Sequence, residues 1–185
     1  MALLPGLKLI TPTLVTYTGS GSGSVDANGT ITYSDAPTVR VNGVFTSSFN
    51  NYYIALETNF TSTGYVDLFL QMMKSGIPNI NTTYYSQYID ANGSSVTGSR
   101  TTAANRATIG VASSSEPSFT DLYIFSPFNS STSTCFIANG VNGYGSIYMR
   151  DYVGTVSDVE TNDGFVISVD PGTISGTIHV YGFNK

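Results

Sequence analysis

Short runs in which apolar and polar residues alternate make up most of this chain. Residues 38–45 and 176–183 are two examples, and Gly, Asn, Asp, Ser and Thr separate such runs from one another. Because successive side chains of a β-strand point to opposite faces, this alternation predicts strands with one buried face. No window has the i, i+3, i+4, i+7 apolar spacing that is typical of a helix. The pattern therefore predicts an all-β protein.

Turn signals divide these runs into about a dozen strands, spaced roughly 8 to 12 residues apart as in a sandwich or a barrel. Asn28 and Asn92 each precede a glycine and predict β-hairpins over residues 24–33 and 83–99. Residues 74–82, which hold a Gly and a Pro, are expected to form a loop. Further strands are predicted at residues 38–45, 52–58, 65–73, 107–111, 119–125, 134–138, 146–152, 165–169 and 176–183. We expect a jelly-roll-like antiparallel β-sandwich with an extended N-terminal arm.

The first residues differ from the rest of the chain. Residues 1–24 combine an apolar arm with a Gly/Ser hinge at residues 19–24, and residues 25–185 are expected to form a single domain. The arm is too apolar to remain a free tail, so it should pack on its own domain, on a neighbouring subunit or on a host particle. Its candidate assembly residues are Leu3, Leu4, Leu7, Leu9 and Ile10.

Composition narrows the range of partners. The net charge is −5, and the seven Lys and Arg are scattered, which argues against binding to nucleic acid or to an anionic membrane surface. No run approaches the ~20 apolar residues of a membrane-spanning helix, and the N-terminal segment lacks the basic region of a secretory signal. We expect a soluble protein that is made in a cytoplasm and inserts into no membrane.

Residues that could carry chemistry are few, since the chain has one His, one Cys and no Trp. Cys135 lies in a predicted strand and is expected to be buried in the core. His179 should share a strand face with Tyr181, opposite Ile178 and Val180, and no serine-nucleophile motif or second metal ligand accompanies it. We therefore predict no catalytic residues, no metal site and no cofactor.

The string Asp-Ala-Asn-Gly occurs twice, beginning at Asp26 and at Asp90. It resembles the start of a calcium loop, but the closing glutamate is missing in both places, so we interpret both strings as hairpin turns. Glu57 and Asp67 lie in predicted strands and are the carboxylates considered for glycoside hydrolysis, a minor alternative.

Tyrosine and phenylalanine are the remaining residues that could form a binding surface. The pair Tyr52 and Tyr53, like the pair Tyr84 and Tyr85, should place one ring inward and its neighbour outward. Outward tyrosines suit a subunit interface or sugar stacking. We favour core and interface packing because sugar platforms usually contain Trp.

Residues 4–10, 41–54 and 172–185 together resemble a family of small virion proteins of tailed bacteriophages, notably cyanophages and marine phages. The second stretch has the Phe-Thr-Ser and Asn-Asn-Tyr entry to a core strand, and the third closes on Gly-Thr-Ile-His-Val-Tyr-Gly-Phe. At His179 related endings commonly have Arg or another polar residue. The resemblance implies a β-sandwich of the virion, of the tail fibre or capsid decoration type and often trimeric, with no catalytic residues.

The expected function is therefore that of a non-enzymatic virion structural protein, made in the host bacterial cytoplasm and displayed on the particle. Its expected partners are other virion proteins and further copies of itself, with a trimer favoured and a host surface glycan as a candidate ligand. The alternative is a carbohydrate-binding or polysaccharide-degrading receptor module. Placement on the head or on the tail stays open.

Overall fold

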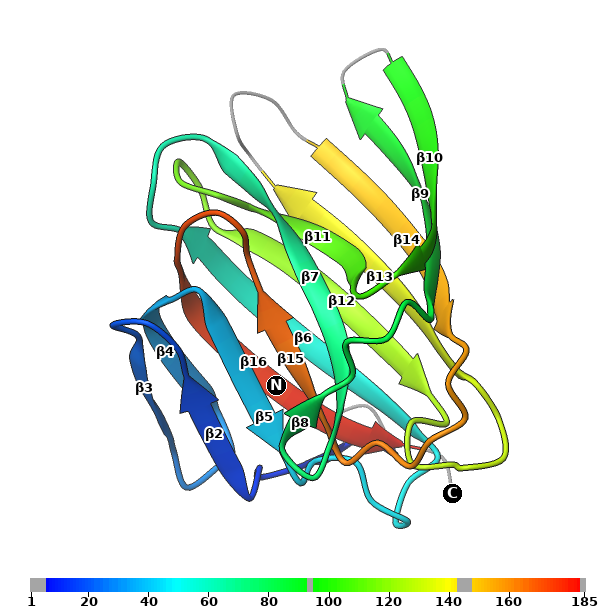
Figure 1. Ribbon diagram of the computed structural model, residues 1–185. Coiled ribbons are helices and arrows are strands. Elements are labelled where there is room, and N and C mark those ends of the chain that lie inside the picture. Colours follow the sequence, from blue (N-terminus) through cyan, green and yellow to red (C-terminus); the bar gives the residue numbers. More distant parts are fainter. Residues whose placement is uncertain (1–5, 93–94, 143–147, 184–185) are drawn as a thin grey trace.

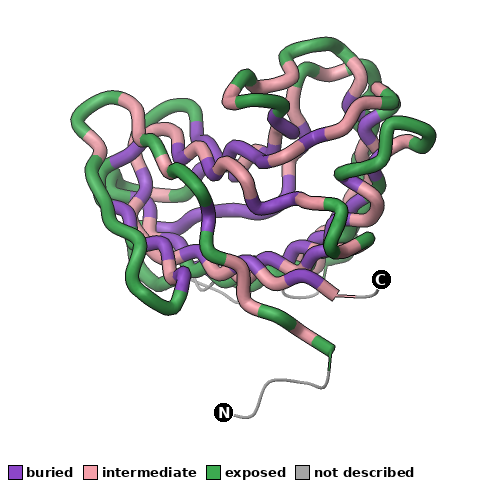
Figure 2. Tube along the Cα trace, turned by 90° about the horizontal axis from the view of Figure 1, so that it is seen from below, coloured by how far each residue is buried: buried purple, intermediate pink, exposed green. Residues whose placement is uncertain are grey.

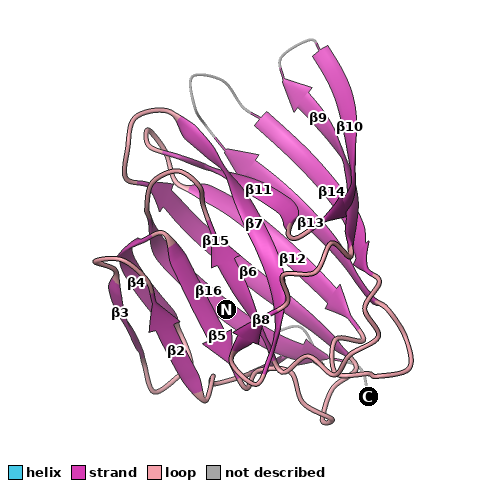
Figure 3. Ribbon diagram, viewed as in Figure 1, coloured by secondary structure: helices cyan, strands magenta, loops and turns pink. Residues whose placement is uncertain are grey.

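The computed structural model describes residues 6–92, 95–142 and 148–183, and within these ranges the chain forms strands and loops without a helix (Figure 3). The described strands join into one curled, mixed sheet of 16 strands (Figure 1). In chain order they are β1 (Lys8–Leu9), β2 (Leu14–Tyr17), β3 (Ser22–Val25), β4 (Ile31–Ala36), β5 (Thr38–Asn42), β6 (Asn51–Phe60), β7 (Tyr65–Lys74), β8 (Ile77–Pro78), β9 (Tyr84–Asn92), β10 (Ser95–Ala104), β11 (Ala107–Ser113), β12 (Ser118–Phe125), β13 (Thr134–Asn142), β14 (Tyr148–Val156), β15 (Gly164–Ser168) and β16 (Ile174–Phe183). The all-β prediction is confirmed.

Two antiparallel runs of strands make up the sheet. The long run has the order β10-β9-β14-β13-β12-β6-β16-β4-β3, and the short run has the order β11-β7-β15-β5-β2. A parallel bridge between Ser113 of β11 and Asn59 of β6 connects the two runs. The sheet curls at this point, so that the short run lies over the inner side of the long run (Figure 1).

Alternation along the strands builds the core between the two runs. Ile178 and Val180 of β16 are fully buried, while His179 and Tyr181 point away from the core, as predicted. The buried side chains of both runs form one contiguous apolar cluster. Figure 2 shows the buried positions alternating with half-buried and exposed ones along the strands.

Both predicted hairpins are present. In the first, β3 and β4 are joined by a turn in which Oδ1 of Asp26 accepts hydrogen bonds from the backbone N–H groups of Asn28 and Thr30, each 2.8 Å long. The first Asp-Ala-Asn-Gly string thus closes a hairpin, as interpreted. In the second, β9 pairs with β10 and Asn92 lies opposite Ser95. Gly93 and Ser94 lie outside the described residues.

The prediction of a loop over residues 74–82 is wrong in its first part. Strand β7 continues to Lys74, and β8 pairs back onto it with Pro78 opposite Met73. Ser75 and Gly76 connect the two strands with φ angles of 52° and 79°. Positive φ at both central residues is what a tight type I′ hairpin turn requires, and Gly76 takes such an angle without steric cost.

Candidate functional site

A row of three tyrosines crosses the outer face of the long run. The outer face is the side of these strands that points away from the core. Tyr53 of β6 lies opposite Tyr123 of β12 on one side and Tyr181 of β16 on the other. Its ring centroid lies 5.1 Å from that of Tyr123 and 5.7 Å from that of Tyr181, within the range of aromatic contact. All three side chains are half-buried. Tyr53 is therefore covered by an aromatic ring on both sides.

Polar contacts extend this tyrosine row. The hydroxyl of Tyr53 donates a hydrogen bond of 2.5 Å to Oδ1 of Asp121. Partial burial raises the pKa of Tyr53, and the bond to the Asp121 carboxylate raises it further because that bond favours the neutral phenol. On β16 the imidazole of His179 lies nearly parallel to the ring of Tyr181, at 6.4 Å between centroids.

An apolar groove of about 490 Å³ lies beside the tyrosine row on the same face, over β12, β13, β14 and β9. Its lining includes Tyr85, Phe125, Cys135, Ile137 and Val153. Cys135 is exposed, so the prediction that it is buried in the core is wrong. Its neighbours Thr134 and Phe136 are the buried residues, and alternation therefore turns the thiol to the outer face.

Exposed apolar side chains continue from the groove across the outer face. They are Tyr85, Ile89, Val96, Phe119, Ile137, Val141, Met149 and Val153, and their exposed fractions range from 37% for Tyr85 to 72% for Val96. The members lie on five adjacent strands, β12, β13, β14, β9 and β10. A row of polar residues on the same face, Asp121, Asn139 and Asp151, separates Ile137 and Val153 from Phe119, Val141 and Met149. Large exposed apolar surfaces usually mark interaction sites. We call this set the apolar patch.

The candidate assembly residues of the arm are placed in part. Leu3 and Leu4 lie outside the described residues. Leu7, Leu9 and Ile10 are half-buried, Leu9 lies opposite Tyr181 of β16, and the backbone N–H of Ile10 donates to the carbonyl oxygen of Val180 at 2.8 Å. The described part of the arm therefore packs on its own domain, and a role for it in attachment stays a prediction.

The Gly/Ser hinge is partly strand in the structure. β3 begins at Ser22 within this tract and pairs with β4, and β2 precedes the tract and pairs with β5. These strands therefore hold residues 14–25 on the rest of the sheet.

The two carboxylates considered for hydrolysis lie on different runs. Glu57 is exposed on the outer face of β6, and Asp67 belongs to β7 of the short run. Oδ1 of Asp67 lies 3.4 Å from one terminal nitrogen of the Arg150 guanidinium. The other terminal nitrogen of Arg150 lies 2.8 Å from Oδ2 of Asp90. Asp67 thus belongs to an ion group that ties β7 to β14 and β9, in which Arg150 and Asp90 are largely buried and Asp67 is half-exposed. Within residues 6–92, 95–142 and 148–183, no three His, Cys, Asp or Glu side chains gather as metal ligands would.

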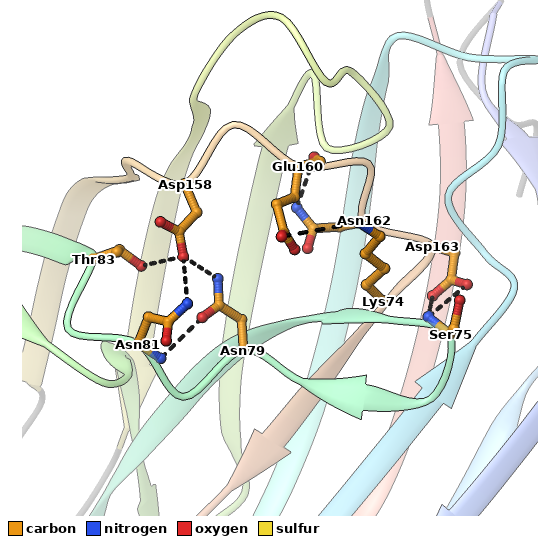
Figure 4. Close-up of polar contacts among 9 residues, drawn as sticks. All are labelled: Lys74, Ser75, Asn79, Asn81, Thr83, Asp158, Glu160, Asn162 and Asp163. Atoms are coloured by element: carbon orange, nitrogen blue, oxygen red, sulfur yellow. Dashed lines mark hydrogen bonds and ion pairs between the residues drawn. The ribbon is translucent and has the colours of Figure 1, made fainter.

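A second polar cluster joins two loops at one end of the sheet (Figure 4). Oδ2 of Asp158 accepts hydrogen bonds from the side chains of Asn79, Asn81 and Thr83, at 2.9, 3.0 and 3.2 Å. Desolvation raises the pKa of this carboxyl, but the three hydrogen bonds outweigh it and the pKa of Asp158 is lowered. The cluster holds the loop after β8 against the loop after β14.

Sequence reasoning predicted one inward and one outward ring in each tyrosine pair, and this is confirmed: Tyr52 and Tyr84 are buried, whereas Tyr53 and Tyr85 lie on the outer face. It missed the grouping of Tyr53 with Tyr123 and Tyr181, and it missed the apolar patch. Alternation assigns each residue to one of two faces, whereas the cross-strand neighbours depend on which strands pair and in which register. The available signal was the presence of apolar residues on both faces of residues 134–141 and 148–156.

A scan against protein-family models, a search of curated proteins and a search of solved structures each gave no match. In the part of the chain that the structure describes, no helix is long and apolar enough to cross a membrane.

Proposed function

We propose that this chain is a non-enzymatic structural protein of a tailed-phage virion, displayed on the particle as a tail fibre component or a capsid decoration. We further propose that the apolar patch is the surface through which it meets other virion proteins. The resemblance of residues 4–10, 41–54 and 172–185 to small virion proteins motivates the first part.

The observation that carries the proposal is the exposure of the apolar patch. Ile89, Met149 and Val153 are each at least 50% exposed, on strands whose opposite faces carry buried or half-buried side chains. Fully burying an apolar side chain of this size contributes about 1.5–3 kcal/mol. These side chains do not gain that energy while they face water. A partner that covers these strands recovers this energy, which supports an assembly role.

The tyrosine row supports assembly over sugar binding. A sugar stacks on the open face of an aromatic ring, and the ring of Tyr53 has Tyr123 on one side and Tyr181 on the other. The hydroxyl of Tyr53 is likewise engaged by Asp121. The centre of the row thus offers little free ring face to a glycan.

A second part of the proposal concerns the architecture of the fold. We propose that the curled sheet is a jelly-roll-like sandwich in which the long and short runs are the two layers. The shared apolar cluster between the runs supports this, since it includes Ile54 and Leu122 of the long run and Leu70 and Ile167 of the short run.

The experiment compares purified protein with intact virions of the phage that encodes it. We expect gold-labelled antibody to mark the head or the tail, and we expect the thiol of Cys135, which is exposed in the isolated chain, to react more slowly in the virion. Val153→Asp should reduce incorporation, whereas the control Val159→Asp should not, because Val159 is similarly exposed, at 47% against 53%, but lies in a loop outside the apolar patch. Absence of label would refute the virion role, an equally reactive thiol would show that the groove stays uncovered in the particle, and normal incorporation of Val153→Asp would refute the patch as the contact surface.

A further inference from the structure

Strand β10 is the longest exposed edge of the described sheet. It has ten residues and pairs with β9 on one side, while β2 and β3, at the ends of the short run and the long run, have four residues each. An unpaired edge presents a row of backbone N–H and C=O groups that a further strand can bind. Proteins usually keep such edges short or guard them with charged residues, prolines or bulges. The edges at β2 and β3 follow this rule by their length.

Strand β10 is only weakly guarded. Arg100 is its one charged residue, it has no proline, and its ladder with β9 is regular from Ser95 to Thr101, with an irregularity only between Thr101 and Ala104. Its side chains from Ser95 to Ala103 are exposed on both faces, so no described part of this chain covers it. In Figure 1 the β9–β10 pair stands at one side of the molecule, where β10 forms the border of the sheet.

We propose that β10 pairs antiparallel with β10 of a second copy of this chain, about a two-fold axis at Gly98. An antiparallel pair of identical strands is self-complementary, because one rotation brings the free donors of each copy to the free acceptors of the other. This inference does not depend on the virion role. It differs from the trimer that the family resemblance implies.

The register follows from the regular part of β10. A two-fold axis perpendicular to the sheet keeps the outer face outward in both copies, so each residue must lie opposite one of the same face. Full pairing of Ser95–Thr101 with itself then places Gly98 opposite Gly98 and Thr97 opposite Ser99. Arg100 lies opposite Val96 in this register, whereas an axis at Arg100 would set two positive charges against each other.

Pairing in this register would also place the apolar patches of the two copies on the same face of the joined sheets. Val96 of β10 and Ile89 of β9 both lie on the outer face, at 72% and 57% exposure. A two-fold axis at Gly98 brings Val96 of each copy next to the β10 edge of the other. The seam of the dimer carries Arg100 as well as Val96 on this face, so the two apolar patches lie on the same side of the joined sheets, on either side of the seam.

The test uses single-cysteine chains in a Cys135→Ser background, because Cys135 is the one native thiol. Gly98→Cys should form a covalent dimer on mild oxidation, since opposite residues of an antiparallel pair have Cβ atoms about 4.5–5.5 Å apart. Arg100→Cys is the matched control: its two copies are four residues apart along the pair, about 14 Å at ~3.4 Å per residue, and should not cross-link. A Cβ at Gly98 would lie 3.2 Å from the carbonyl oxygen of Tyr88. A mixture of Thr97→Cys and Ser99→Cys chains therefore provides a second cross-link in the same register.

Mass in solution gives an independent readout. Sedimentation of the unmodified chain should show a dimer, and Thr97→Lys with Ser99→Lys should yield monomers with an unchanged circular dichroism spectrum, because four added charges then meet at the interface. The control Ser62→Lys with Thr63→Lys adds the same charges to an exposed turn and should leave the dimer intact. A native monomer or trimer, a dimer that persists in the β10 lysine variant, or a cross-link at Arg100→Cys that equals those at the predicted pairs would overturn the proposal.

Discussion

Tyr53 and Asp121 are joined side chain to side chain across two adjacent strands of the outer face. Asp121 lies opposite Ala55, two residues along β6 from Tyr53, so the 2.5 Å hydrogen bond runs diagonally across the β6–β12 pair. This contact holds the central ring of the tyrosine row from its hydroxyl end, while Tyr123 and Tyr181 hold it by its faces.

Replacing the acceptor should change the titration of Tyr53. Burial and the Asp121 bond both raise the pKa of Tyr53, so Asp121→Asn should let this tyrosine ionise at a lower pH than in the unmodified protein. Resonances of ring-labelled tyrosine would follow the titration directly. Asp151→Asn, on the same face two strands away, is the control and should leave Tyr53 unchanged. Equal titration in both variants would contradict this account.

The protein should lose stability in alkaline solution through Tyr33. Burial raises the pKa of Tyr33 to about 12, while its unfolded value is 10.0. The folded state therefore favours the neutral phenol, and the contribution is complete below pH 10 and lost as the pH rises toward 12. At about 1.4 kcal/mol per pKa unit, the loss is roughly 2–3 kcal/mol.

Urea unfolding at pH 9, 10.5 and 12 would measure this loss, and Tyr33→Phe should flatten the pH dependence by the same amount. At pH 7 that variant should cost about 1 kcal/mol, because the hydroxyl of Tyr33 lies 3.0 Å from that of buried Thr58. An alkaline slope identical in both proteins would argue against Tyr33 as the source.

The Asp158 cluster should loosen in acid. The pKa of Asp158 is lowered in the folded protein, so its contribution is present above the unfolded value of 3.8 and is lost as the pH falls through the lower folded value. Asp158→Asn should remove the charged acceptor at every pH and destabilise the contact by about 1–2 kcal/mol. We expect faster amide exchange over residues 77–83 and little change in β12. Uniform acceleration across both regions would show that the cluster supports the whole fold instead.

Two glycines on neighbouring strands should respond differently to alanine. A Cβ at Gly154 would meet Cζ of Phe136 at 2.3 Å and the carbonyl oxygen of Tyr85 at 2.5 Å, while one at Gly140 would meet its nearest neighbour at 3.7 Å. Gly154→Ala should therefore lower the free energy of unfolding by about 1–3 kcal/mol, as overpacking does, and Gly140→Ala should change it much less. Thermal unfolding of the two variants side by side would check this difference.

The strands of this protein were largely predictable because alternation is a local property. Residues 178–181 show it clearly, and the structure places β16 there with Ile178 and Val180 on one face and His179 and Tyr181 on the other, as predicted. β1 and β2 were not predicted as strands. Residues of β1 and β2 belong to an apolar arm that lacks clean alternation. They form strands because they pair with β16 and β5, and such long-range pairing is not visible in the local sequence.

The error at Cys135 shows where local pattern fails. Cys135, Phe136 and Ile137 are all apolar, so the sequence permits either phase of alternation around them. The structure buries Phe136 and Ala138 and with them Thr134, whose hydroxyl oxygen is buried without a hydrogen-bond partner. On the core side of β13 the ring of Phe136 lies next to Gly154 of β14, a contact that local sequence does not reveal. The tyrosine row and the apolar patch depend on such pairings throughout.

The pairing of β1 with β16 determines how the chain would respond to pulling. Lys8 lies opposite Gly182 and Leu9 opposite Tyr181, so the two ends of the chain leave this ladder side by side. Opposing forces on the ends would therefore open the ladder like a zipper, one hydrogen bond at a time, rather than shear many bonds at once. The two residue pairs of the β1–β16 ladder therefore give little resistance to load applied in this direction.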